Sequence, residues 1–270
     1  MSNENSLKIT ITGAHGRMGR ALLETTVDDP ELQLVGALER EEHDGLGLDV
    51  STLIDGETDV TISDDPSTVF EQTDVVVDFT HPDATEQFLE RARETDTSMV
   101  IGTTGLDDEQ TRRLESTAGD VPIVKAPNMS VGINLLANLV AEATETLGED
   151  FDAEILEMHH RHKEDAPSGT ANMLAETIAD VRDLNLENVR EDGRKGFVGE
   201  RSSDEIGIAA LRGGDVVGDH TVILAGEGER LELTHKASSR ETFARGALRA
   251  AKFLENQEAG LYSMKDVLGL

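Results

Sequence analysis

The first half of the chain alternates short runs of β-branched and apolar residues with longer polar segments that favour helix. Strands are expected over 7–12, 33–38, 59–62, 75–79, 99–102 and 123–125. Helices are expected between them, over 20–27, 84–94 and 108–117. Strands that alternate with helices in this way indicate an α/β fold, a Rossmann-type doubly wound parallel sheet.

The pattern changes after about residue 130. Apolar residues recur at roughly helical spacing over 130–147, at Val131, Leu135, Leu139 and Ala143. A strand at 151–158, a helix at 170–181 and strands at 206–211, 221–225 and 231–234 are expected to follow. One helix pair with several later strands predicts a second, smaller α+β domain with a mixed sheet.

Composition excludes several classes of function. The chain has 270 residues, 24 basic and 55 acidic side chains, a net charge of −31 and no cysteine. Thiol nucleophiles, disulfides and thiolate metal sites are therefore absent. The negative charge repels nucleic acid phosphates, so we expect no nucleic acid partner. Because acidic residues recur along the whole chain, the charge favours adaptation to a salt-rich cytoplasm.

We also expect no membrane partner and a cytoplasmic location. The first residues, Met1 to Asn5, lack a basic region followed by an apolar one. The longest uncharged run, 126–141, is shorter than a membrane span and contains Pro127 and several asparagines.

A glycine-rich turn between the first strand and the first helix predicts a dinucleotide site. Gly13, Gly16 and Gly19 are spaced by three, and Glu39 follows at the end of the second strand. Such glycines let the backbone approach a pyrophosphate, helix N–H groups bind its charge, and the acidic residue accepts the ribose hydroxyls. An ordinary strand-to-helix turn is the alternative.

Cofactor preference stays open. Glu39 favours a free ribose 2′-hydroxyl, whereas Arg40 could bind a 2′-phosphate. NADH and NADPH are therefore both plausible, and a solvated arginine is the alternative for Arg40.

Two further loops, 102–105 and 126–132, each follow a predicted strand. Ligands of doubly wound sheets bind at the carboxyl ends of the strands. Both loops are therefore candidates for ligand contact, although either could be a plain turn.

A cationic cluster stands out in this acidic chain. His159, His160, Arg161, His162 and Lys163 are consecutive. Such a cluster suits an anionic ligand. Histidine exchanges a proton near neutral pH, and a neighbouring lysine donates one or holds a carboxylate. The cluster therefore predicts proton transfer to a small anionic substrate.

The turn Ser168-Gly169-Thr170 then opens a helix. Its N–H groups and hydroxyls could cradle a carboxylate, with an ordinary helix cap as the alternative. Metal binding is the competing use of the nearby histidines. They lack the spacing of H-E-x-x-H and no cysteine assists them, so we expect no metal site, only adventitious nickel or zinc.

Across nearly its whole length the sequence resembles the 4-hydroxy-tetrahydrodipicolinate reductase family of the diaminopimelate route to lysine. The most specific segment is 157–171, Glu-x-His-His-Arg-His-Lys-x-Asp-Ala-Pro-Ser-Gly-Thr-Ala. The other matching segments are 13–19, 36–40, 78–82, 102–105, 126–132, 212–221 and 231–240.

The resemblance implies a domain division and an assembly. Residues 1–129 and 241–270 would form the dinucleotide-binding domain. Residues 130–240 would bind the substrate and form the contacts of a homotetramer.

The resemblance also assigns residues to roles. His159 would give and take a proton, and Lys163 would donate one. The substrate ligands would be His160, Gly169 and Thr170, and the helix-start cradle described above adds Ser168. The cofactor contacts would be Gly13, Ala14, His15, Gly16, Arg17, Met18, Glu39, Gly102, Thr103, Thr104, Ala126, Pro127, Asn128 and Met129, and the 2′-phosphate argument above adds Arg40.

The implied reaction is hydride transfer from NAD(P)H to an anionic dicarboxylate heterocycle, with the cationic cluster offsetting the charge that develops. Three alternatives are a reductase of another small dicarboxylate, a dinucleotide-sensing module without catalysis, and a metal-dependent hydrolase.

Overall fold

The computed structural model describes residues 6–270, and the chain divides into two compact units. Unit 1 consists of Met1–Val131 with Arg240–Gly269, and unit 2 of Gly132–Ser239 with Leu270. The divisions thus fall at 131/132 and 239/240, where the resemblance implied 129/130 and 240/241. Within the described part of the chain, no helix has the length and apolar character needed to cross a membrane.

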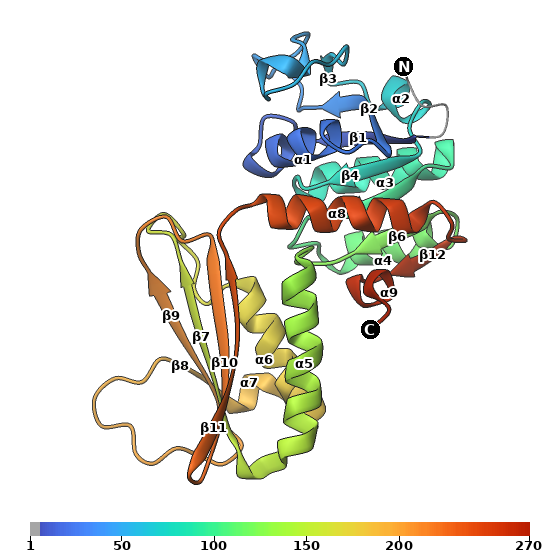
Figure 1. Ribbon diagram of the computed structural model, residues 1–270. Helices are drawn as coiled ribbons and strands as arrows, with labels where there is room; N and C mark the ends of the chain where they lie inside the picture. Colours follow the sequence, from blue (N-terminus) through green and yellow to red (C-terminus); the bar gives the residue numbers. More distant parts are fainter. Residues whose placement is uncertain (1–5) are drawn as a thin grey trace. The chain divides into compact units, whose positions relative to one another are not determined.

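Unit 1 is built on a parallel sheet of seven strands (Figure 1) in the order β12-β6-β5-β4-β1-β2-β3. The order 3-2-1-4-5-6 is that of a Rossmann-type sheet, which confirms the predicted doubly wound fold. The strands are β1 (Leu7–Thr12), β2 (Leu32–Leu38), β3 (Ile62–Ser63), β4 (Val75–Asp78), β5 (Ser98–Ile101), β6 (Pro122–Lys125) and β12 (Gly260–Tyr262).

Helices cover both faces of this sheet because its strands are apolar on both sides. In β4, Val75 and Val77 belong to the core shared with α1 and α8, whereas Val76 belongs to the core shared with α3 and α4. The helices of unit 1 are α1 (Arg17–Val27), α2 (Pro66–Phe70), α3 (Pro82–Thr95), α4 (Asp108–Ala118), α8 (Glu241–Leu254) and α9 (Met264–Leu268), with a 3₁₀ turn at Val50–Thr52.

Unit 2 contains a mixed sheet of five strands in the order β11-β10-β7-β9-β8, as predicted for the second domain. β7 is parallel to β9 and antiparallel to β10. The strands are β7 (Asp152–His159), β8 (Arg190–Asp192), β9 (Ile206–Arg212), β10 (Gly218–Gly226) and β11 (Glu229–Ala237). The helices are α5 (Val131–Leu147), α6 (Gly169–Val181) and α7 (Leu186–Val189), with a 3₁₀ turn at Gly148–Asp150.

The helices of unit 2 pack on one face of its sheet, where alternate strand residues such as Ile155 and Val222 share a core with Leu136 of α5 and Leu174 of α6. The opposite face carries the intervening side chains, of which Leu156 and Leu211 are among the exposed large apolar residues. This uncovered face is called the open face below.

Three sequence-based expectations about elements differ from the structure. The strand predicted at 59–62 is wrong over most of its length, since β3 is only Ile62–Ser63 and Thr61 forms an isolated bridge with Asp49. α1 begins at Arg17 rather than residue 20, because the turn closes at Gly16. No element was predicted after residue 240 from the residues themselves, yet α8, β12 and α9 lie there.

Candidate active site

The glycine turn of unit 1 joins β1 to α1 as the spacing predicts. Gly13 has a positive φ of 65°, and the Gly16 N–H donates to the Gly13 carbonyl oxygen at 2.9 Å. Gly16 is the N-cap of α1, so no side chain caps the first-turn N–H groups. A β-carbon on Gly19 would overlap the backbone of Gly13, so only glycine lets the helix pack this closely. The helix N-terminus is therefore open to an anion.

The carboxylate of Glu39 lies beside this turn. Its Oε2 accepts from the His15 N–H and its Oε1 from the Arg40 N–H, both at 3.0 Å. Burial and the neighbouring His43 lower the pKa of His15, against the opposite effect of Glu39. Glu39 is thus held by two backbone donors at the end of β2, and the side chain of Arg40 is exposed.

Asp78, at the end of β4, organises the neighbouring loops and was not among the predicted site residues. It is fully buried, and its Oδ1 accepts from the Thr12 and Thr80 hydroxyls at 2.7 and 2.6 Å. Its Oδ2 accepts from the hydroxyls of Thr85 and Thr103. One carboxylate therefore connects the loops that follow β1, β4 and β5. The sequence signal for Asp78 is the Asp-Phe-Thr segment at 78–80, which belongs to the family resemblance.

Gly102, Thr103 and Thr104 follow β5 and are tied to the adjacent strands. The Thr103 hydroxyl accepts from the Thr80 N–H at 3.0 Å, and Lys125 Nζ donates to the Thr103 carbonyl at 2.6 Å. Burial lowers the pKa of Lys125, while Asp78 acts in the opposite direction. The loop is therefore fixed from both sides of β5.

Ala126, Pro127, Asn128 and Met129 follow β6 at the same edge of the sheet. The side chains of Ala126 and Met129 are buried in the core of unit 1. Their backbone groups alone are thus available to a ligand. The Asn128 Oδ1 accepts from the Ser130 N–H at 2.8 Å, which shapes the turn into α5.

A pocket of about 1020 Å³ opens on this edge of unit 1. It is lined in part by Gly13, Gly16, Glu39, Arg40 and Thr80. Residues 102–104 and 126–129 are not among its lining residues, so the pocket covers only one end of the predicted cofactor contacts.

We expect Asp78→Asn to weaken dinucleotide binding about 10-fold and to lower the free energy of unfolding by about 1–3 kcal/mol, because the amide NH₂ must face hydroxyls that now donate to a carboxylate. Fluorescence titration with NADH and urea unfolding measure the two effects. Asp74→Asn is the control, since Asp74 precedes the same strand and accepts from the exposed Lys8 N–H. Equal effects of the two substitutions would contradict the role of Asp78.

In unit 2, Glu157 of β7 is the centre of a second polar network. Its carboxylate is fully buried and accepts four hydrogen bonds. Oε2 accepts from His159 Nδ1 and Arg212 Nη1, both at 2.7 Å. Oε1 accepts from Arg212 Nη2 at 2.9 Å and from the Ser168 N–H at 3.1 Å. Burial alone raises the pKa of Glu157, but the hydrogen bonds from Arg212 and His159 outweigh it and hold the pKa below its usual value.

This network orients His159. With Nδ1 bound to Glu157, Nε2 is the ring nitrogen left to exchange a proton. A β-carbon on Gly218 would come within 3.1 Å of Nε2, so the glycine leaves that side of the ring open. The edge of His220 packs on the ring of His159, with centroids 5.1 Å apart.

Ser168 joins the start of α6 to the same network. Its hydroxyl accepts from the Ala171 N–H at 3.1 Å and lies 3.0 Å from His220 Nε2. Burial lowers the pKa of His220 to about 4, so its ring is neutral at neutral pH. Ser168 is 2% exposed and serves as the helix cap, whereas Gly169 is exposed at the helix start. The N-terminus of α6 is thereby held next to His159.

The cationic residues follow directly after β7. Lys163 Nζ pairs with Asp165, at 2.8 and 2.7 Å from its two carboxylate oxygens, and this hydrogen bond lowers the pKa of Asp165. Arg161 and His162 are exposed, and the rings of His160 and His162 are 6.3 Å apart. An oriented imidazole, several cations and a helix N-terminus together suit proton transfer to a small carboxylate-bearing molecule.

Glu157, Arg212 and His220 lie in segments that resemble the family, but the sequence predicts no role for them. β7 pairs in parallel with β9 so that His159 lies opposite Arg212, and β10 pairs so that His220 lies opposite Glu157. The sequence signal for Glu157 is its position in β7. It lies on the covered face of the sheet with Ile155, where the alternation of the strand predicts an apolar residue and not a charged one.

Comparisons with known proteins agree with this architecture. The family model for the N-terminus of dihydrodipicolinate reductase matches residues 7–129, and the family model for its C-terminus matches residues 132–268. A 4-hydroxy-tetrahydrodipicolinate reductase of Burkholderia lata is 50% identical over 98% of this chain and all of its own length. The reductase of Nitrosospira multiformis is 49% identical over 98% of this chain and 99% of its own.

Among solved structures, a dipicolinate-bound dihydrodipicolinate reductase from Paenisporosarcina sp. TG-14 superposes with a TM-score of 0.76. It is 26% identical, and the match covers 96% of this chain and 97% of that one. With both family models and full-length relatives near 50% identity, the chain belongs to the dihydrodipicolinate reductase family.

Proposed function

We propose that this chain is a cytoplasmic enzyme that reduces 4-hydroxy-tetrahydrodipicolinate to tetrahydrodipicolinate with NADH or NADPH. The 4-hydroxyl leaves as water, and one hydride and one proton add to the conjugated ring system. The observation that carries the proposal is the Glu157-held His159 beside the cationic loop and the α6 N-terminus. Such a site suits a dicarboxylate heterocycle. Dipicolinate, the molecule bound in the Paenisporosarcina reductase, has the same chemical class. Unit 1 would bind the dinucleotide and unit 2 the substrate.

The residues of unit 1 fit a dinucleotide. The uncapped N–H groups at the start of α1 suit the pyrophosphate, and the Glu39 carboxylate beside them suits the ribose hydroxyls. When bound, the reduced nicotinamide supplies the hydride. Thr103 and the backbone of 126–129 lie at the carboxyl ends of β5 and β6, where they would contact the nicotinamide end.

The residues of unit 2 would bind the substrate and move the proton. His160, Gly169 and Thr170 would hold its carboxylates, while Lys163 offsets negative charge and donates a proton. His159 Nε2 would deliver a proton to the substrate as the hydride arrives. Glu157 then stabilises the imidazole in the orientation that keeps Nε2 on the side of the ring that Gly218 leaves free.

The test is oxidation of NADH and of NADPH in about 2 M KCl, where the Debye length is only about 2–3 Å. The heterocycle is generated in the assay from aspartate semialdehyde and pyruvate by its synthase. Oxidation that depends on this coupling is expected and ranks the two cofactors. A folded protein that binds NADH and oxidises neither cofactor would favour a dinucleotide sensor or a reductase of another dicarboxylate.

We further propose that the chain forms a homotetramer through the open face of the unit 2 sheet. Leu156 of β7 and Leu211 of β9 are 37% and 47% exposed there, although strand leucines are normally covered. The loop 193–205 adds Phe197, which is fully exposed, and Val198. A second copy of the chain would cover these apolar side chains.

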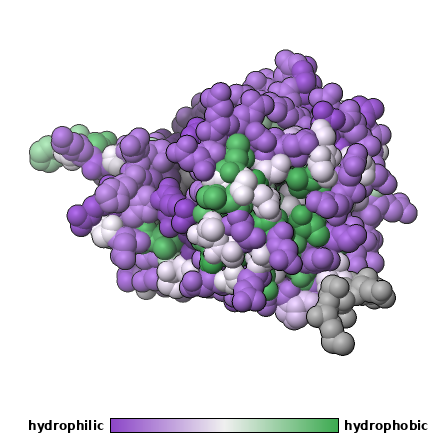
Figure 2. Space-filling model, turned by 90° about the horizontal axis from the view of Figure 1, so that it is seen from above, coloured by the Kyte–Doolittle hydropathy of each residue, from purple (hydrophilic) through white to green (hydrophobic). Residues whose placement is uncertain are grey.

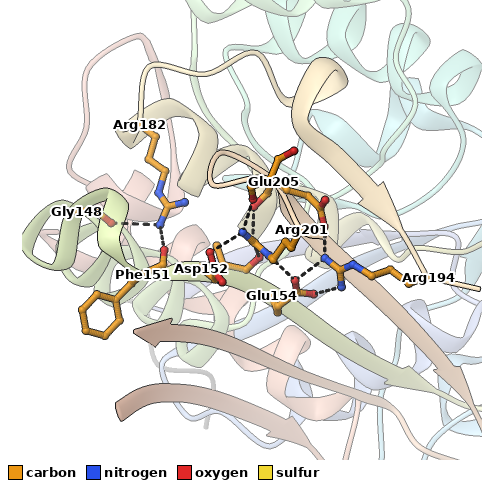
Figure 3. A network of polar contacts seen from close by, with 10 residues as sticks. Gly148, Phe151, Asp152, Glu154, Arg182, Arg194, Arg201 and Glu205 are labelled. Atoms are coloured by element: carbon orange, nitrogen blue, oxygen red, sulfur yellow. Dashed lines mark hydrogen bonds and ion pairs between the residues drawn. The ribbon is translucent and has the colours of Figure 1, made fainter. Parts of the chain in front are cut away.

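An ion-pair network fixes both ends of this loop to β7 (Figure 3). Arg201 donates to Asp152 Oδ1 at 2.7 Å and to Glu154 Oε1 at 3.1 Å. Arg194 donates to Glu154 at 2.7 Å and also pairs with Glu205. The loop therefore projects its apolar residues from a rigid base, which suits a preformed contact surface.

We expect Leu211→Glu to dissociate the tetramer into smaller species, because like charges would oppose each other on an apolar contact. Sedimentation velocity at fixed salt measures the change. Leu261→Glu is the matched control, since Leu261 of β12 is also 47% exposed but lies in unit 1. If Leu211→Glu sedimented like the parent protein, the open face would not be the interface.

We expect activity and tetramer stability to rise with KCl up to about 2 M, since salt screens repulsion among 55 acidic side chains. Figure 2 shows hydrophilic residues over most of one face of the molecule, around a less polar centre. Activity and sedimentation in a KCl series measure the effect. Full activity and an intact tetramer in dilute buffer would contradict it.

A further inference from the structure

A group of potential metal ligands surrounds Glu39 in unit 1. His15 lies in the glycine turn, Glu39 follows β2, and His43 lies in the next loop. One ligand atom from each residue lies within 4.8 Å of the other two. Among residues 6–270 this is the one such group of three, and all its members are partly buried.

The ring of His15 is held at this site by its packing against the loop that contains His43 and Gly45. Its Nδ1 is buried, lies 4.0 Å from Glu39 Oε2 and has no hydrogen-bond partner in the described part of the chain. The rings of His15 and His43 are 4.3 Å apart. A β-carbon on Gly45 would overlap the His15 ring, so the loop backbone packs directly on the imidazole. Buried polar atoms are normally hydrogen-bonded, so a buried nitrogen without a partner indicates a place where a ligand binds.

We propose that His15, Glu39 and His43 bind one divalent transition-metal ion, with Zn²⁺ as the best match. Two imidazoles and one carboxylate form the donor set of zinc sites that keep a coordination position open. The three ligand atoms lie within 4.8 Å of one another, so a metal placed centrally among them is at most about 2.8 Å from each. If each ligand atom moves toward the metal by about 0.7 Å, the distances reach the roughly 2.0–2.2 Å of zinc–ligand bonds.

The charge of the loop around His43 favours cation binding. His43 Nδ1 accepts from the Gly45 N–H at 3.0 Å, which fixes the ring in the loop, and a metal bound at that nitrogen would replace this hydrogen bond. Glu41, Glu42 and Asp44 flank the histidine and raise the local concentration of cations. The sequence-based expectation was that the chain has no metal site, argued from the histidines at 159, 160 and 162. A site at His15, Glu39 and His43 departs from it.

The site has a consequence for the dinucleotide. Glu39 is the carboxylate proposed to accept the ribose hydroxyls, and a metal bound to it would withdraw that acceptor. Metal and NADH therefore compete. This step rests on the proposed cofactor site, whereas metal binding itself does not.

The first experiment measures Zn²⁺ bound to the full chain by equilibrium dialysis and elemental analysis, in chelator-free KCl buffer. One Zn²⁺ per chain is expected at low free Zn²⁺, below the concentrations of adventitious binding at His159, His160 and His162, with affinity at least about 10-fold weaker in His43→Gln. Asp44→Asn is the matched control, because it removes a neighbouring negative charge but no ligand, and it should keep most of the affinity. Parent-like Zn²⁺ binding by His43→Gln would overturn the site.

The second experiment repeats the titration with saturating NADH. The apparent Zn²⁺ affinity should fall at least about 10-fold in the parent protein, while His43→Gln binds NADH like the parent in metal-free buffer. Unchanged Zn²⁺ affinity, in a protein shown to bind NADH, would overturn the competition. Failure to bind NADH at all would instead contradict the proposed function and leave the dialysis result to decide the metal site.

Discussion

Replacing His159 by asparagine should lower kcat by about 10²- to 10⁴-fold, the usual contribution of a general acid or base. Asparagine retains a polar group that can meet Glu157, but it supplies no proton at Nε2. Because the dinucleotide is proposed to bind in unit 1, the affinity for NADH should stay within about twofold of the parent value. Steady-state kinetics of the coupled reaction and a fluorescence titration with NADH give the two quantities.

His162→Asn is the matched control for His159. His162 belongs to the same cationic loop, but its side chain is exposed and it follows the end of β7 by three residues. Its replacement should raise KM for the heterocycle less than about 10-fold with little change in kcat, as expected for the loss of a general attraction for anions. Equal losses of kcat in the two variants would mean that His159 has no special part in proton transfer.

Local features of unit 1 could be predicted from sequence because their causes are local. About two dozen residues contain the glycine spacing, the strand before it and the helix after it. Glu39 can be recognised as a candidate ribose ligand because it ends the strand that follows. The alternation of strands and helices likewise predicts the doubly wound sheet, which the strand order confirms. Periodicity also predicted the helix that became α5, to within one residue of its start.

Features that depend on distant pairing could not be predicted from the residues alone. Asp78 receives a hydrogen bond from Thr103, 25 residues away, and Glu157 from Arg212, 55 residues away. Those partners are fixed by sheet order and register, which a local pattern does not carry. α8 shows the same limit. Its buried positions Ala244, Ala247, Leu248 and Ala251 have helical spacing, but nothing nearby says that it packs on the first sheet.

Glu157→Gln should be the most disruptive isosteric change in unit 2. The carboxylate oxygens of Glu157 accept four hydrogen bonds, from His159 Nδ1, the Ser168 N–H, and Nη1 and Nη2 of Arg212. A glutamine must place its NH₂ group against some of them and leaves the guanidinium without its counter-charge. We expect the free energy of unfolding to fall by about 2–4 kcal/mol, less than for a completely buried pair because Arg212 is 21% exposed.

The same substitution should also lower kcat by about 10- to 100-fold, because His159 and the α6 N-terminus lose their common anchor. Glu232→Gln is the control, since Glu232 lies on β11 of the same sheet and its ion pair with Arg230 is exposed, 46% and 68% for the two side chains. Urea unfolding and steady-state kinetics, run at one salt concentration, compare the two variants. If Glu157→Gln lost stability but kept parental kcat, the carboxylate would stabilise unit 2 without orienting the histidine. If Glu157→Gln lost both stability and kcat while KM for NADH stayed unchanged, the same four hydrogen bonds of Glu157 would both stabilise unit 2 and orient His159.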